Sequence, residues 1–181
     1  MSRKVLVAYA SKMGATAEIA EGIGGEIRQH GHVVEVCEVK QVRSVDEYDA
    51  VVVGSAIYAG RWRSEAVRFL SKHADALHDR QVWLFHSGPV GPHADQPQAM
   101  PRKVRQLADR IGAGPATTFA GRLDPETAKG FLARRMAATE LGGDSRDWDR
   151  IGAWAQDVAA AITSADVSTW RRPEQAQERL P

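Results

Sequence analysis

KVLVAYASKMGAT, residues 4–16, decides the fold, because it places a buried strand directly before a short loop and a helix. The run from Val5 to Ala10 is apolar, as is typical of a strand that is covered on both faces. After Thr16 the pattern changes, and isoleucines recur at every fourth position from Ile19, which predicts an amphipathic helix. The start of a helix offers unpaired backbone N–H groups and the positive end of the helix dipole. We therefore expect residues 11–16 to bind a phosphate group.

The loop has the spacing S-x-x-G-x-T, in which Ser11 and Thr16 supply hydroxyl groups and Gly14 has no side chain. This spacing alone also fits a helix cap that binds no ligand. The chain has no G-x-G-x-x-G after the strand and no G-x-x-x-x-G-K-[ST], which excludes a dinucleotide fingerprint and a Walker loop. The phosphate of a mononucleotide remains as the expected ligand.

The composition is that of an ordinary globular protein, because 43% of the 181 residues are hydrophobic and 26% are charged. We expect one domain over residues 1–165 with a sizeable core, followed by a polar tail, residues 166–181, that is free to fray into disorder. No apolar stretch approaches the ~18 residues of a membrane-spanning helix. The single cysteine, Cys37, cannot form an internal disulfide and lies in an apolar alternation. We therefore expect it to be a strand residue of a protein in the reducing cytoplasm.

Beyond the first helix, strands and helices alternate along the chain. The apolar patterns predict strands at residues 33–39, 49–54, 81–86 and 116–120, and helices at residues 63–77, 102–111, 125–141 and 147–163. This alternation predicts an α/β fold with a parallel sheet and helices on both faces. Glu35 and Glu38 indicate that the second strand lies at an edge of the sheet. Ligands bind beyond the carboxyl ends of such strands, so residues 11–16, 55–62 and 87–90 should meet there.

Three stretches carry a resemblance to a known family. YDAVVVGS at residues 48–55, AIYAGRW at residues 56–62 and the S-x-x-G-x-T loop together resemble the flavodoxin-like FMN-binding family. More narrowly, the chain is similar to the short branch that includes bacterial menaquinone-dependent protoporphyrinogen oxidase. That branch has a G-[SA]-[SA]-I-x-x-G loop after the third strand, a G-x-L turn and a later Gly-Gly pair, matched here at residues 54–60, 121–123 and 142–143. The resemblance covers roughly residues 3–163.

The resemblance implies a three-layer, doubly wound, flavodoxin-like sheet of five parallel strands in the order 2-1-3-4-5, with FMN as the cofactor. A deazaflavin remains an alternative. The residues that the resemblance implies for the FMN phosphate are Ser11, Lys12, Met13, Gly14, Ala15 and Thr16. Those implied beside the isoalloxazine ring are Ser55, Ala56, Ile57, Tyr58, Ala59 and Gly60, and those implied on its other side are Ser87, Gly88, Pro89, Val90 and Gly91.

This chain departs from the family pattern at Met13, where flavodoxins usually carry a third hydroxyl group. One phosphate hydrogen bond is therefore missing, and the charge of Lys12 can offset its loss. Tyr58 and Trp62 are the candidates for stacking on the flavin, because aromatic faces pack on flat rings. The alternative is that both pack against the helix that follows.

Charge distinguishes two functions that share this fold. Flavodoxin carriers are strongly acidic, whereas this chain has a formal net charge of +1, so docking through an acidic face is poorly supported. Arg61 and Arg63 flank the flavin loop together with Trp62, and Arg122 follows the fifth strand. Arginine pairs well with carboxylates, so this rim would suit a substrate such as a porphyrinogen with its propionates. Each arginine alone is also explained as solvated surface charge.

The implied function is an FMN-dependent oxidoreductase with two-electron chemistry between a small-molecule substrate and a quinone-type acceptor or redox protein. We expect no nucleic acid as a partner.

No Ser-His-Asp pattern, H-E-x-x-H motif or Cys/His metal spacing is present, so we assign no catalytic side chain and no metal. We interpret His86 as a hydrogen-bonded structural residue. Arg134 and Arg135 leave peripheral membrane contact open. Two alternatives remain, a flavodoxin-type electron carrier and a flavin-free interaction module.

Overall fold

The computed structural model describes residues 1–88, 90, 94, 96–123 and 143–164. Its main sheet has the strand order β2-β1-β3-β5-β6, and all neighbours along this path are parallel. These strands are β1 Lys4–Ala10, β2 Val33–Glu38, β3 Ala50–Tyr58, β5 Gln81–Ser87 and β6 Thr117–Phe119. Because β5 and β6 are the fourth and fifth strands of the expected sheet, the fold class and the order 2-1-3-4-5 are confirmed. The second strand lies at an edge, as its glutamates predict.

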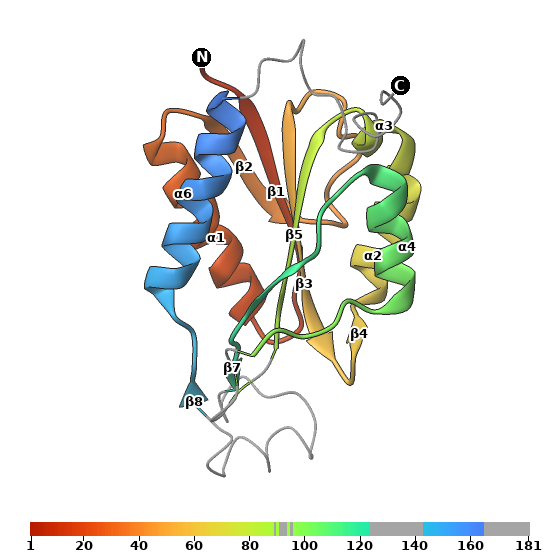
Figure 1. Ribbon diagram of the computed structural model, residues 1–181, viewed down its shortest axis with the longest axis vertical. Coiled ribbons are helices and arrows are strands. Elements are labelled where there is room, and N and C mark those ends of the chain that lie inside the picture. Colours follow the sequence, from red (N-terminus) through yellow and green to blue (C-terminus); the bar gives the residue numbers. More distant parts are fainter. Residues whose placement is uncertain (89, 91–93, 95, 124–142, 165–181) are drawn as a thin grey trace, which may run out of the picture.

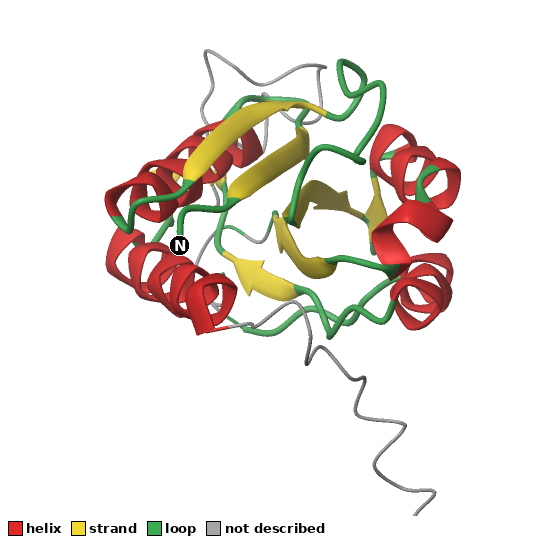
Figure 2. Ribbon diagram, turned by 90° about the horizontal axis from the view of Figure 1, so that it is seen from above, coloured by secondary structure: helices red, strands yellow, loops and turns green. Residues whose placement is uncertain are grey.

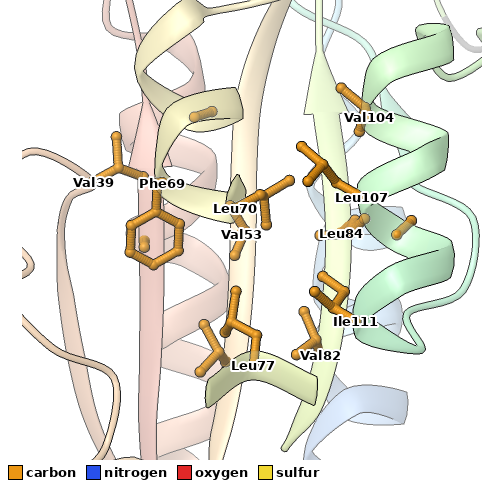
Figure 3. Packing of buried hydrophobic residues seen from close by; sticks show 14 of the residues in the cluster. Val39, Val53, Phe69, Leu70, Leu77, Val82, Leu84, Val104, Leu107 and Ile111 are labelled. Atoms are coloured by element: carbon orange, nitrogen blue, oxygen red, sulfur yellow. The ribbon is translucent and has the colours of Figure 1, made fainter. Parts of the chain in front are cut away.

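Helices cover both faces of the sheet in a three-layer arrangement (Figures 1 and 2). One layer contains α1 Ala15–Gln29 and α6 Trp148–Ser164, and the other contains α2 Ser64–Lys72, α3 Ala74–His78 and α4 Arg102–Ile111. Successive strand residues point to opposite faces. Val51 and Val53 therefore pack under α2 and α4, and Val52 packs under α1 and α6. Figure 3 shows the first of these two clusters, in which Leu70 and Leu107 face the sheet from α2 and α4.

Two predicted boundaries near the third strand are wrong. Strand β3 does not end at Gly54 but continues to Tyr58, and it then returns as the antiparallel strand β4, Arg61–Trp62. Residues 55–62 are therefore a β-hairpin and not an open loop. The single helix that we expected over residues 63–77 is two helices, because α2 ends at Lys72 and His73 separates it from α3.

A second, small sheet was not predicted. Strand β7, Arg122–Leu123, pairs antiparallel with β8, Gly143–Asp144. The ribbon lies at the lower end of the molecule in Figure 1, beyond the carboxyl ends of the parallel strands. The expected helix at residues 125–141 and the polar tail at residues 166–181 lie outside the described residues. Within the described part, no helix has both the length and the apolar character needed to cross a membrane.

Cys37 lies half-buried in β2, as expected of a strand residue. Burial and the neighbouring Glu35 raise the pKa of its thiol to about 11, so the thiol is protonated at neutral pH. Glu35 accepts a hydrogen bond of 2.6 Å from the hydroxyl group of Tyr48. The protonated state of the Cys37 thiol agrees with the interpretation of this cysteine as a structural residue, since the thiolate is the nucleophilic form.

Candidate cofactor site

The segments that follow β1, β3 and β5 meet at one edge of the sheet. The hydroxyl oxygens of Thr16 and Ser87 lie 2.7 Å apart, although 71 positions separate these residues in sequence. The ammonium group of Lys12 lies 5.5 Å from the centre of the Tyr58 ring. Gly88 packs so closely on β3 that an added Cβ atom would lie 2.5 Å from the carbonyl oxygen of Ile57. The three segments thus converge as the sequence predicts.

The loop at residues 11–16 is built as an anion site from its backbone outward. Gly14 precedes α1 with a φ of 91°, a left-handed conformation that glycine adopts without strain. Its N–H donates to Oγ of Ser11 at 3.1 Å, and its carbonyl oxygen accepts the first helical hydrogen bond from Glu18 at 3.0 Å. Among the described residues, no side chain caps this helix start. The N–H groups of residues 15–17 are therefore available to an anion.

Thr16 is held in a buried position at the start of α1. Its side chain is 1% exposed, and a single O–H···O hydrogen bond joins its hydroxyl group to that of Ser87. Either oxygen can be the donor in this pair. Because two hydroxyl hydrogens are present and one is used, the second remains available to a phosphate oxygen.

Met13, the departure from the family pattern, has an apolar role in the structure. It packs with Val90 and Leu123 in a small cluster that is separate from the two large cores. Met13 belongs to the phosphate loop, Val90 follows β5 and Leu123 lies in β7. The loop position at which we expected a missing phosphate hydrogen bond therefore makes an apolar contact that joins three segments of the site.

A chain of ion pairs lies beside the phosphate loop. Glu18 in the first turn of α1 binds Arg122 through two contacts of 2.8 and 3.2 Å, and binds Nη1 of Arg146 at 2.7 Å. The Arg146 side chain is 4% exposed and also pairs with both oxygens of Asp144. The two arginines offset the carboxylate that would otherwise repel a phosphate. Arg122 therefore lies at the phosphate loop, engaged with Glu18, and not in an open substrate rim.

Arg146 is a residue of the site that the sequence analysis missed. Its partner Glu18 is 128 positions away, and no local pattern marks it. Its position before α6 in a stretch with several charges gives no signal that separates it from ordinary surface arginines.

The residues present fit a phosphate group. In the part of the chain that the structure describes, the buried Nε atoms of Arg63 and Arg122 have no hydrogen-bond partner. Arg63 lines a cleft of about 360 Å³ together with Ser11, Lys12 and Gly14. Nη2 of Arg122 lies 3.9 Å from the point that a Cβ atom would occupy if Gly14 carried a side chain. Cationic groups thus approach the loop from two arginines, while backbone N–H groups are free at the helix start.

The predicted flavin-ring segment forms the turn of the β3–β4 hairpin. Ser55, Ala56 and Ile57 are buried in β3, so the exposed part of the segment is Tyr58, Ala59 and Gly60. Tyr58 pairs with Arg61, which makes a two-residue turn with a positive φ at both Ala59, 47°, and Gly60, 69°. No heavy atom of the described residues lies within 4 Å of a Cβ atom on Gly60, so its backbone conformation is what requires glycine.

Replacing Gly60 by valine should weaken FMN binding about tenfold and lower the free energy of unfolding by ~1–2 kcal/mol, the cost of a left-handed conformation in a residue with a side chain. Flavin titration and denaturant unfolding measure the two effects. The matched control is Gly114→Val, since Gly114 also has open space around its Cβ position but no positive φ. Normal FMN affinity in Gly60→Val would show that the hairpin turn does not form the ring site.

Trp62 lies in the core and not on the exposed rim. Its side chain is 6% exposed, and Nε1 donates a hydrogen bond of 3.1 Å to Nδ1 of His86. Of the two aromatic residues proposed to stack on the flavin, Tyr58, which is 38% exposed, therefore remains the candidate. Burial of Trp62 matches the alternative reading of an aromatic residue that packs against the following helix.

His86 is fully buried and structural, as expected. Since its Nδ1 accepts from Trp62, the ring hydrogen is on Nε2, which donates to Oγ1 of Thr118 at 2.8 Å. The N–H of Gln98 donates to the same oxygen at 2.8 Å. Burial lowers the pKa of His86 to about 4, against the opposing effect of a hydrogen bond with the Gln98 backbone. The imidazole is therefore neutral at physiological pH and joins β4, β5 and β6.

The other predicted rim residues differ in how accessible they are. Arg61 is exposed at the hairpin. Arg63 is partly buried, donates from Nη2 to Glu65 at 2.8 Å and donates its backbone N–H to Oγ of Ser55 at 3.0 Å. Pro89 and Gly91, which we expected near the flavin, lie outside the described residues.

Comparison with known proteins agrees with this geometry. Over 76 residues the chain is 32% identical to the protoporphyrinogen IX dehydrogenase [quinone] of Escherichia coli strain K12, a match that covers 41% of this chain and 42% of that protein. Matched structures include a flavodoxin from the domain Archaea, with a TM-score of 0.62 and 15% identity over 88% of this chain and 99% of the other. They also include rubredoxin oxygen:oxidoreductase from Desulfovibrio gigas, with a TM-score of 0.60 and 16% identity over 89% of this chain and 36% of the other. At these identities the structural matches show the fold. A model of the flavodoxin domain matches residues 6–139, and the chain therefore belongs to the flavodoxin domain family.

Proposed function

We propose that this chain is an FMN-dependent oxidoreductase that removes electrons in pairs from a carboxylate-bearing, porphyrinogen-like substrate and passes them to a quinone-type acceptor. The observation that carries the proposal is the 32% identity over 76 residues to a protein named protoporphyrinogen IX dehydrogenase [quinone]. The fold alone supports an enzyme and an electron carrier equally. Because the match spans less than half of that relative, the substrate and the acceptor are part of the proposal.

Membership of the flavodoxin domain family implies FMN as the cofactor. The N–H groups at the start of α1 and the hydroxyl groups of Ser11 and Thr16 would hold its phosphate, with Lys12 adding charge. The hairpin turn with Tyr58 would lie beside its ring. FMN, when bound, supplies the two-electron chemistry. In each two-electron step two hydrogens leave the substrate, which gains a double bond, and one quinone becomes a quinol, so that three such steps convert a porphyrinogen into a porphyrin.

The protein's own task in this proposal is binding and orientation. Arg61 is the exposed arginine of the predicted rim and lies at the hairpin. The other two arginines are less accessible, since Arg63 binds Glu65 and Arg122 binds Glu18. His86 is neutral and fully buried, so it does not exchange protons with a substrate at neutral pH. Proton release from a substrate N–H to solvent needs no dedicated base.

The test is anaerobic turnover of protoporphyrinogen IX by the FMN-loaded protein with a menaquinone analogue as the acceptor. We expect porphyrin formation that depends on both FMN and the quinone. Absence of turnover, together with two resolved one-electron steps in a reductive titration, would favour the electron carrier. Absence of flavin absorbance after addition of FMN would favour the flavin-free interaction module.

Reversing the charge of Arg61 should raise the apparent KM for a carboxylate-bearing substrate about three- to tenfold, as expected for the loss of an exposed charge contact worth ~1 kcal/mol. Steady-state kinetics of Arg61→Glu measure this effect, which should shrink at high salt because exposed charges are screened. FMN affinity should change much less than KM, because the Arg61 side chain is exposed and the charged phosphate of FMN would be held at the other loop, residues 11–16. Lys103→Glu on α4 provides the matched control, and an equal rise in KM there would contradict a specific role for Arg61.

A further inference from the structure

A second cleft, of about 200 Å³, lies between the segment that follows β2 and helix α2. Its floor is apolar and consists of Val39, Val42 and Phe69. Figure 3 shows Val39 and Phe69 together at the end of the buried cluster that is remote from α4. The basic side chains of Lys40, Arg68 and Lys72 complete the lining. We call this cleft the α2 groove.

The cations of the α2 groove are poorly neutralised. Arg68 and Lys72 are exposed and four residues apart on one helix, a spacing at which like charges repel each other. Neither has a hydrogen bond or ion pair with any described residue. Lys40 lies 3.7 Å from Glu38, but its side chain is 64% exposed, and such exposed pairs contribute little. An anionic ligand would remove the repulsion that the free protein retains.

The remaining polar residues of the lining do not cancel this charge. The carboxylate of Glu65 is already bound to Arg63 at 2.8 Å. His73 is buried, and burial lowers its pKa further below neutrality with help from Lys72, against the opposing charge of Asp46. The groove therefore combines three cations, one engaged carboxylate and an apolar floor.

The α2 groove adjoins the cofactor site. Lys40 lines both this groove and the cleft beside the phosphate loop, which it shares with Ser11, Lys12 and Gly14. Helix α2 begins at Ser64, two residues after β4 ends at Trp62. The two clefts are therefore neighbours, and the helix that lines the groove follows the hairpin directly in the chain.

We propose that the α2 groove binds the carboxylate arms of the substrate, with Lys40, Arg68 and Lys72 as the cationic partners and the partly exposed Val42 as the apolar contact for its body. The inference rests on the proposed function and adds further residues to the carboxylate recognition that it assigns to Arg61. Of the three arginines that the sequence favoured for this role, Arg63 and Arg122 are already engaged with glutamates, and Arg61 is exposed. The ligand class is an apolar molecule that carries two or more carboxylates.

The experiment is a binding titration of the FMN-loaded protein with mesoporphyrin IX, a stable porphyrin dicarboxylate, and with its dimethyl ester. We expect the dicarboxylate to bind about tenfold more tightly than the ester, and Arg68→Gln/Lys72→Gln to abolish most of this difference. The matched control is Arg102→Gln/Lys103→Gln, which removes two neighbouring exposed cations from α4 and should leave the difference intact.

The outcomes separate this inference from the proposed function. Unchanged dicarboxylate binding in Arg68→Gln/Lys72→Gln, with porphyrinogen turnover intact, would overturn the groove and leave the function standing. An equal loss in the α4 control would also overturn the groove, because it would show general attraction of charge. If the wild-type protein does not oxidise porphyrinogen but Arg68 and Lys72 still control dicarboxylate binding, the groove is supported and the function is not.

Discussion

Lowering the pH from 6.5 to 4 is expected to reduce the free energy of unfolding by about 3 kcal/mol through His86 alone. The folded state holds the pKa of this residue at about 4, chiefly by burial, whereas an unfolded chain restores the ordinary value near 6.5. Between these two values the unfolded state binds a proton that the folded state rejects. The stabilisation is therefore complete above pH 6.5 and is lost as the pH falls toward the folded pKa.

Denaturant unfolding at a series of pH values measures this effect, and His86→Gln isolates it. Glutamine does not titrate, yet its amide can accept from Trp62 and donate to Thr118. The variant should lose stability at pH 7 but show a shallower decline in acid than the wild type. His30→Gln is the control, because His30 is exposed. His73, whose pKa burial also lowers, adds a decline of the same sign that persists in both variants. An identical decline in His86→Gln would contradict the assignment.

Thr16→Ala should weaken FMN binding about 10- to 100-fold, because a hydrogen bond to a charged phosphate contributes roughly 1.5–3 kcal/mol. The variant removes the hydroxyl group that pairs with Ser87 at the start of α1. Titrations with FMN and with riboflavin, which lacks the phosphate, measure the effect. Riboflavin affinity should change little, so the preference for FMN should fall by nearly the full factor.

Thr117→Ala is the matched control for Thr16, since it removes the same group from β6. Ser87→Ala tests the pair from the other side and should have the smaller effect, because the Thr16 hydroxyl remains beside the loop. A change below twofold in Thr16→Ala would mean that this threonine supports the helix start and does not bind phosphate.

The sequence predicted the frame of the site because that frame depends on local patterns. The switch from an apolar strand to four-residue periodicity at Thr16 determines where β1 ends and α1 begins. The loops converge because parallel strands bring their carboxyl ends to one edge. The extension of β3 into a hairpin was not predictable in the same way, because Ala59-Gly60 lacks the Asn-Gly or Asp-Gly signal of such turns.

Roles that depend on distant partners could not be predicted from the sequence. Trp62 resembles a loop aromatic until His86, 24 positions later, accepts its hydrogen bond in the core. Arg122 and Arg63 resemble free rim cations until Glu18 and Glu65 are placed beside them. Met13 resembles a lost phosphate ligand until its contacts with Val90 and Leu123 are known. In each case tertiary packing decides the role.

The β7–β8 ribbon has a consequence for how this chain tolerates change in length. Arg122 pairs with Asp144 and Leu123 with Gly143, so the chain leaves and re-enters the described fold at adjacent points. Arg146 then ties the returning strand to Glu18 on α1. The pairing of β7 with β8 thus fixes the separation of these two points, whatever the number of residues between them.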